Sequence, residues 1–180
     1  SVSAFLLNRS SDLSLNNTAV DYSIAAGQTN SASAWSTSIG SANTAQNYSF
    51  AQGKANLAQN YSFAQGESVI ATGQHSHAEG YQTSAQGNRS HAEGYHTIAE
   101  GNGSHTEGQY TYAYSDFTHA EGSYSYAEGG VSHAEGGYTT AVGYFSHTEG
   151  YSTKASGEAS HAEGEYTYAI GNYSHTEGYY

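Results

Sequence analysis

The chain has no cysteine, no proline and no methionine among its 180 residues, and it has only four basic residues. Without cysteine it can form neither disulfides nor a Cys-type zinc site, and it has no thiolate chemistry. The formal net charge is −12, so the chain should repel nucleic-acid phosphates and anionic lipid surfaces. No apolar run approaches the length of a membrane span. We therefore expect no nucleic-acid partner and no direct membrane insertion.

What the chain does contain is a short repeat. Words such as Tyr-Ser-Phe-Ala-Gln-Gly (48–53) recur at steps of thirteen residues in the first part of the chain. From Gly66 onward a Gly stands at every seventh position except Ser115, and two such sevens make a repeat of fourteen residues. Twelve copies of the word end at Gly27 through Gly178. A fixed short period over this length is typical of a solenoid, in which each repeat is one coil stacked on the last.

The repeat predicts short strands separated by turns. A coiled coil is disfavoured because Gly costs roughly 1 kcal/mol at a helical position and the sevens lack apolar a and d positions. Strand alternation directs Ser, Ala, Thr and Gly to one side, where small residues allow a very thin roll. We therefore predict an all-β solenoid of about twelve coils, each with two strands of about five residues. Residues 1–19 form the expected lead-in or cap and 20–180 the roll, with 13-residue coils to about residue 66 and 14-residue coils after it.

The opposite side of the first strand in each coil carries two polar columns. Histidine recurs at His77, His91, His105, His119, His133, His147, His161 and His175. Glutamate follows two positions later, at Glu79, Glu93, Glu107, Glu121, Glu135, Glu149, Glu163 and Glu177. The outward side of the second strand is expected to carry Tyr110, Tyr112, Tyr114, Tyr124, Tyr126, Tyr138, Tyr166 and Tyr168. Tyrosine suits a ligand face because it is flat and apolar with a polar tip, but it is also a good strand former on a solvated sheet.

The repeated words resemble a known family. The copies at 22–27 and 35–40, the word Ser-His-Ala-Glu-Gly and the intervening Thr-x-Ala-x-Gly resemble the YadA-like head repeats of trimeric autotransporter adhesins, over residues 20–180. The resemblance implies a left-handed parallel β-roll, three copies of which associate side by side as a homotrimer. It also implies a subunit contact, formed by the His and Glu columns together with Ile24, Ile39, Phe50 and Phe63. The chain departs from the family there, because the family has Val and Ile at the positions of the His and Glu columns.

The His and Glu columns allow three interpretations. The favoured one is a hydrogen-bonded His–Glu network, between neighbouring coils or across the subunit contact, because stacked carboxylates repel one another and the histidines offer donors. The alternative is a metal site with the eight histidines as candidate ligands, but nothing in their spacing is specific to a metal, so no metal or other cofactor is predicted. A catalytic dyad is disfavoured, since enzymes usually hold one activated pair in a pocket.

The same columns predict a pH dependence, because histidine changes charge between pH 5 and 8. If His and Glu pair across the subunit contact, the glutamates raise the folded-state pKa of histidine, whereas burial of neutral histidine lowers it. The Glu column and the net negative charge favour the raised pKa.

The function that the sequence predicts is a non-enzymatic adhesin head, extracellular or on a bacterial cell surface. It would be a rigid rod that displays side chains to a host surface, a matrix protein or a glycan. The alternative is structural: a segment of a phage tail fibre in a virion, since similar repeats occur in bacteriophage fibre proteins, or a subunit that stacks end to end into an extracellular filament. An ice-binding protein would need a flat Thr array facing water, and the Thr column is expected to face inward. Because residue 1 is Ser rather than Met, we expect a processed chain or a piece of a longer protein.

Overall fold

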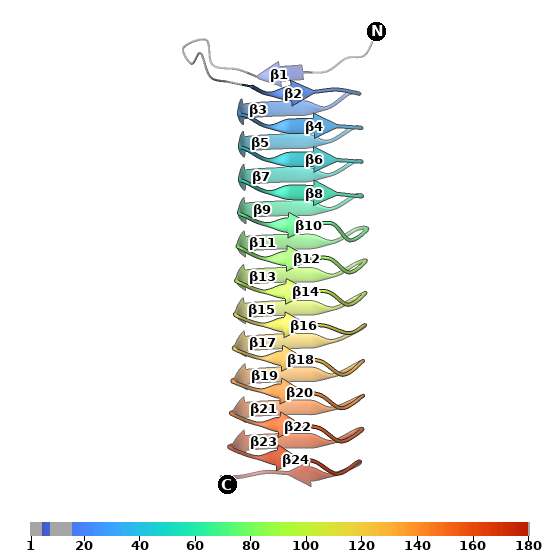
Figure 1. Cartoon of the computed structure of the whole chain (residues 1–180), viewed down its shortest axis with the longest axis vertical. Helices are drawn as coiled ribbons and strands as arrows, with labels where there is room; N and C mark the ends of the chain where they lie inside the picture. The colour runs from blue at the N-terminus through green and yellow to red at the C-terminus, as the bar shows by residue number, and fades with distance from the viewer. Residues whose placement is uncertain (1–4, 8–15, 180) are drawn as a thin grey trace.

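The computed structural model describes residues 5–7 and 16–179, with the backbone alone at 5–7. In this part of the chain all regular elements are β-strands, and they form two parallel sheets of thirteen and twelve strands (Figure 1). Consecutive strands alternate between the sheets, so each coil contributes one strand to each sheet. The predicted all-β solenoid is confirmed. No helix among the described residues could cross a membrane, and of the predicted lead-in, residues 1–4 and 8–15 lie outside the described residues.

The first sheet is built from the longer strands of the coils. Its strands are β1 (Phe5–Leu7), β3 (Ile24–Gln28), β5 (Thr37–Ser41), β7 (Phe50–Lys54), β9 (Phe63–Glu67), β11 (His77–Tyr81), β13 (His91–Tyr95), β15 (His105–Gln109), β17 (His119–Ser123), β19 (His133–Gly137), β21 (His147–Tyr151), β23 (His161–Glu165) and β25 (His175–Thr176). Most of them have five residues, as expected.

The second sheet is built from shorter strands. They are β2 (Thr18–Ala19), β4 (Ser31–Ser33), β6 (Thr44–Gln46), β8 (Leu57–Gln59), β10 (Ile70–Ala71), β12 (Ser84–Ala85), β14 (Ile98–Ala99), β16 (Tyr112–Ala113), β18 (Tyr126–Ala127), β20 (Thr140–Ala141), β22 (Lys154–Ala155) and β24 (Tyr168–Ala169). The prediction of about five residues was wrong for these strands, which have two or three. The turns that connect the strands contain residues with positive φ, such as Tyr110 on one side of the roll and Phe117 on the other.

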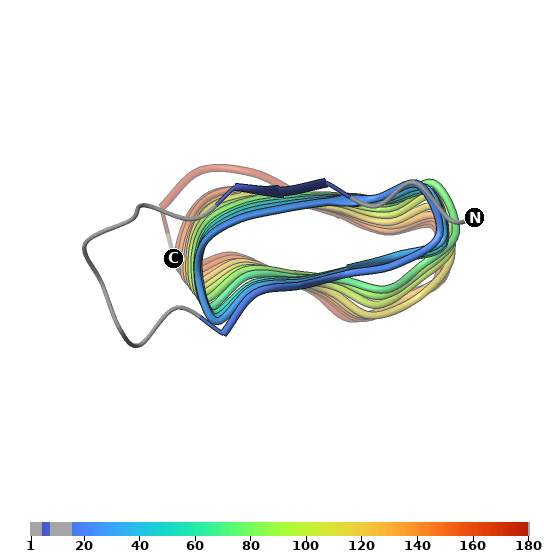
Figure 2. The same cartoon turned by 90° about the horizontal axis from the view of Figure 1, so that it is seen from above.

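The coils stack in register, so each repeat position becomes a column along the rod. In β11 and β13, for example, His77 pairs with His91, Glu79 with Glu93 and Gly80 with Gly94. Seen along the long axis, the coils lie over one another as a flattened ring (Figure 2). A column therefore places identical side chains one strand spacing apart, about 4.8 Å.

The interior is filled by the small residues that the alternation predicted. Twenty side chains make up the apolar core, nineteen alanines and Val69, and all have zero exposure. The Ser and Thr columns, such as Ser90 and Thr97, are buried beside them. The inward direction of the Thr column, which counted against ice binding, is confirmed.

The glycine column at the end of each long strand is required by close contact between coils. Gly108 has a φ of +109°, and a Cβ placed on it would lie 2.1 Å from the carbonyl oxygen of Gly122. A side chain would therefore both strain the backbone and push the next coil away.

A buried asparagine ladder runs through the 13-residue coils. The side chain of Asn43 donates to the carbonyls of Ile39 and Gly53, each at 2.8 Å. Its Oδ1 accepts the backbone N–H of Asn56 at 2.9 Å, and the backbone N–H of Asn43 donates to Asn30 Oδ1 in the same way, at 3.1 Å. Each asparagine thus links three consecutive coils. In the 14-residue coils this position holds first Val69 and then Thr or Ser.

Candidate functional site

A continuous stack of aromatic rings runs along the outer face of the first sheet. It begins with Phe50 and Phe63, continues through the eight predicted histidines and ends at His175, with ring centroids 4.6–5.1 Å apart. Ile24 precedes Phe50 in the same column, and Ile39 belongs to the column that becomes the Glu column. The structure therefore brings together on one face all the residues that the resemblance assigns to a subunit contact.

Histidine and glutamate of the same strand lie next to each other without forming a hydrogen bond. In seven of the eight coils the distance from His Nε2 to Glu Oε2 is between 3.5 and 4.0 Å. That is longer than a hydrogen bond. Seven of the Nε2 atoms, those of the column from His77 to His161, are shielded from solvent and have no hydrogen-bond partner among the described residues. The predicted hydrogen-bonded network between coils is thus not formed among the described residues, and the alternative, a network across a subunit contact, stays a prediction.

Stacking also sets the charge of the histidines. Burial lowers the pKa of His91, His105, His133 and His161, and the neighbouring histidines lower it further. The glutamates act in the opposite direction but more weakly. Within one chain the Glu column therefore does not raise the pKa of these four residues, and a raised pKa through pairing across a subunit contact stays a prediction. Near neutral pH they are uncharged, with a lone pair on one ring nitrogen.

Near the C-terminal end, the columns form three overlapping groups of metal-ligand atoms. They are His133–Glu135–His147, His147–Glu149–His161 and His161–Glu163–His175. In each group, one ligand atom from every residue lies within 4.8 Å of the others. Two imidazole nitrogens and a carboxylate oxygen are ligands that suit zinc and its neighbours in the first transition row.

The predicted tyrosine face divides into two parts. Tyr112, Tyr126 and Tyr168 lie on strands of the second sheet, and Tyr114 directly follows β16. The placement on the second strand was wrong for the other four, which lie in the turn before that strand with φ between 54° and 59°: Tyr110, Tyr124, Tyr138 and Tyr166.

The turn tyrosines are held by bonds between coils. The backbone N–H of Tyr110 donates to the carbonyl of Tyr95 in the preceding coil, and that of Tyr124 donates to Gln109. This bond fixes the left-handed backbone at the turn. The rings of Tyr110, Tyr124 and Tyr138 stack at 4.9 Å, with His96 at the head of the row.

A second aromatic row lies at the opposite turn of the 13-residue coils and was not predicted as a site. Tyr22, Trp35, Tyr48 and Tyr61 stack with nearly parallel rings at 4.5–6.3 Å. Each side chain is 51–57% exposed. The signal in the sequence was the aromatic residue that opens each of these words, directly before the buried Ser. We call Tyr22, Trp35, Tyr48 and Tyr61 the aromatic row.

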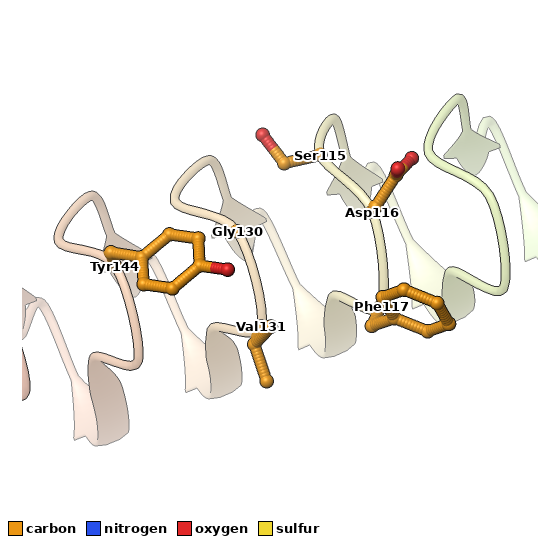
Figure 3. A pocket seen from close by; sticks show the side chains of 6 residues that line it. All are labelled: Ser115, Asp116, Phe117, Gly130, Val131 and Tyr144. Atoms are coloured by element: carbon orange, nitrogen blue, oxygen red, sulfur yellow. The ribbon is translucent and has the colours of Figure 1, made fainter.

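A surface hollow of about 600 Å³ interrupts the turns of the later coils (Figure 3). Phe117 and Tyr144 stand on either side of Gly130 and Val131, with Ser115 and Asp116 above them. The hollow occurs because a ladder of turn side chains ends here: Asn102 donates to Asp116 at 2.7 Å, but the next residue in that column is Gly130. The hollow is wide open, and it combines a carboxylate, hydroxyls and two rings.

Comparison with known proteins agrees with the resemblance predicted from the sequence. The family model of the YadA head domain repeat matches the chain in two copies, over residues 78–104 and 120–146. Each copy covers about two coils. The copies begin directly after the histidine that opens β11 and the histidine that opens β17. This domain is a structural domain of adhesins. No curated protein sequence matches the chain.

Proposed function

We propose that this chain is the head of an extracellular or cell-surface adhesin, a rigid rod without enzymatic activity that attaches to an extended partner such as a matrix protein or a glycan. The observation that carries the proposal is the aromatic row. Its rings stack along the rod axis, so their faces cover one another and their edges meet solvent. A partner would meet apolar edges interspersed with hydrogen-bonding groups, the phenol hydroxyls and the indole N–H, at the spacing of the coils.

An extended partner fits this row better than a compact ligand does. The row follows consecutive coils, so it is a line rather than a pocket. Tyrosine and tryptophan are also the residues that contribute most to binding energy in protein interfaces. The match to the YadA head domain repeat supports an adhesin-type role.

We also propose that three copies associate through the outer face of the first sheet. The isoleucines and the ring stack of this face are partly exposed, and the shielded Nε2 atoms have no hydrogen-bond partner in the part of the chain that the structure describes. Contact with two further copies would cover the apolar columns. It would also bring donors and acceptors to the imidazoles.

Adhesion is tested with the triple variant Trp35→Ser, Tyr48→Ser, Tyr61→Ser. Labelled protein is applied to immobilised extracellular-matrix proteins and to a glycan array, and bound label is measured. We expect at least a tenfold loss of binding with unchanged circular dichroism, because these side chains are more than half exposed. Tyr173→Ser, at an exposed tyrosine outside the aromatic row, is the matched control.

A second triple variant tests the predicted tyrosine face: Tyr110→Ser, Tyr112→Ser, Tyr124→Ser. Loss of binding in this variant alone would indicate that the ligand binds at the opposite turn rather than at the aromatic row. Equal binding by both triple variants and the unaltered chain would contradict both tyrosine surfaces, and no binding by the unaltered chain would favour the structural alternative, a phage fibre segment or a filament subunit. The trimer is tested separately by light scattering, and a stable monomer would contradict it.

A further inference from the structure

The separation between His Nε2 and Glu Oε2 is a few tenths of an ångström wider than that of two ligands on one tetrahedral zinc ion. In His133–Glu135 it is 3.8 Å and in His161–Glu163 it is 3.9 Å. These distances exceed a hydrogen bond. Two donors at about 2.0–2.2 Å from the same zinc ion stand roughly 3.4 Å apart at a tetrahedral angle and farther apart when the angle opens.

The same nitrogen atoms are shielded and unpaired. Nε2 of His133, His147 and His161 has almost no contact with solvent and no hydrogen-bond partner among the described residues. A buried polar atom without a partner is costly. An ion between imidazole and carboxylate would account both for the long distance and for the unpaired nitrogen.

We propose that the His–Glu face binds divalent transition-metal ions of the zinc type. Each ion is held by Nε2 of two histidines from consecutive coils and by the carboxylate of the glutamate that shares a strand with the first histidine. Two imidazoles and one carboxylate leave a fourth position of a tetrahedral ion open for water or for a group from another chain. Magnesium and calcium would be rejected, because they prefer sites made of oxygen ligands.

Binding requires one rearrangement. The rings of His133 and His147 are stacked 4.8 Å apart at 17°, so their lone pairs lie in nearly parallel planes. Each ring must turn about its Cβ–Cγ bond toward the shared ion, and its half-exposed position leaves room for that turn.

Sharing of nitrogens limits the number of ions. The middle group uses His147 and His161, which also belong to the first and third groups. One Nε2 can coordinate one ion, so the first and third groups can be filled together while the middle group stays empty. The three groups therefore hold two ions per chain.

The experiment is calorimetric titration of the full chain, freed of metal with a chelator, with zinc chloride at pH 7.5. The double variant His147→Phe, His161→Phe removes one ligand from each of the first and third groups. Phe50 and Phe63 occupy the same column and stack in the same way, so this variant keeps the ring stack and is expected to fold. It should bind two ions fewer than the unaltered chain, whereas His147→Phe alone should bind one fewer.

The matched control is His96→Asn. His96 lies in the turn, stacked on Tyr110 and outside the His column, so the number of ions should not change. The carboxylates are tested with Glu135→Gln, Glu163→Gln, which should weaken zinc binding at least tenfold, compared with Glu158→Gln in an exposed turn. Cobalt(II) in place of zinc should give the visible absorption of a tetrahedral site in the unaltered chain and lose it in the double Phe variant.

Absence of zinc binding would overturn the proposal, and so would an unchanged number of ions in the double Phe variant. Light scattering with and without zinc keeps this inference apart from the proposed trimer. Two ions bound to a monomer would support the metal site and contradict the trimer. A trimer that binds no zinc would support the trimer and contradict the metal site.

Discussion

The coils before residue 66 and the coils after it fill the same buried column in two different ways. In the first region the column holds Asn30, Asn43 and Asn56, and in the second it holds mainly Thr, such as Thr97. Asparagine and threonine have similar volumes, so both fit the thin interior. They differ in bonding: the asparagine amides reach carbonyls of two coils, whereas several of the threonine hydroxyls, including that of Thr97, have no partner among the described residues.

This difference indicates that the roll needs a small side chain in this column but does not need a hydrogen-bonding one. Val69 makes the same point, because it occupies the column at the border of the two regions and is fully buried. The asparagine ladder should therefore stabilise the first region. In the second region, the buried threonine hydroxyls without a partner should lower the free energy of unfolding. Each of the following predictions tests one side of that comparison.

The largest effect is expected for Asn43→Ala. The substitution removes two part-buried bonds to carbonyls and leaves the buried N–H of Asn56 without its acceptor. Since unpaired buried groups cost about 1–3 kcal/mol each, we expect a loss of about 3 kcal/mol or more in the free energy of unfolding, measured by urea denaturation. Asn102→Ala, at an exposed turn asparagine, is the control and should lose less than about 1 kcal/mol. Equal losses in the two variants would show that the ladder adds no special stability.

The arrangement of the coils was predictable because the repeat itself carries it. Glycines at fixed steps predicted the turns, and strand alternation predicted the buried Ser, Ala and Thr columns. The outward His and Glu columns followed from the same alternation, and the register of β11 and β13 confirms them. Regular spacing and period-two alternation are properties of the sequence alone, so no three-dimensional information was needed.

The features that were missed depend on contacts between coils. Tyr110 was expected on a strand but lies in a turn, because its N–H bonds to the preceding coil. Alternation cannot show where a strand ends. The pKa of His105 is lowered by burial within the ring stack and by the histidines above and below it. The sequence alone does not show that these effects are larger than that of the nearby glutamate. The bonds of the asparagine ladder likewise join residues thirteen positions apart.

The next effect concerns pH and should be confined to the second region. Unfolded histidine has a pKa of about 6.5, and the folded pKa of His91, His105, His133 and His161 is lower. Below about pH 6.5 the unfolded chain therefore binds more protons than the folded chain, so stability is complete above that pH and is lost as the pH falls. Thermal melts should show a lower Tm at pH 5.5 than at pH 7.5.

The variant His105→Phe, His133→Phe should reduce this loss, because phenylalanine cannot be protonated and already occupies the column at Phe50 and Phe63. A higher Tm at pH 5.5 in the unaltered chain would mean that pairing with glutamate dominates after all.

A smaller effect, in the opposite direction, is expected for Thr97→Val. The Thr97 hydroxyl is buried without a partner among the described residues, and valine of similar shape removes it. We expect a gain of about 1 kcal/mol in the free energy of unfolding. Thr167→Val is the matched control, because Thr167 donates to the carbonyl of Glu163 at 3.0 Å, and it should show no gain. Destabilisation by Thr97→Val would indicate that the hydroxyl is bonded in solution.

The smallest effect is expected in a column where the two regions differ at the surface. At the end of the long strands, Lys54 pairs in register with Glu67, and the same column continues with Tyr81 and Tyr95. Lys54 Nζ lies 2.8 Å from Glu67 Oε1, but the side chains are 66% and 45% exposed. Water and salt screen such a pair, and holding two long side chains together costs entropy. Lys54→Met should therefore leave Tm unchanged within error, and 0.5 M NaCl should not separate the variant from the unaltered chain. Tyr95→Ser, which removes a ring stacked on Tyr81 at 5.2 Å, should cost about 1 kcal/mol. A larger loss in Lys54→Met than in Tyr95→Ser would mean that charge, rather than ring stacking, stabilises this edge of the roll.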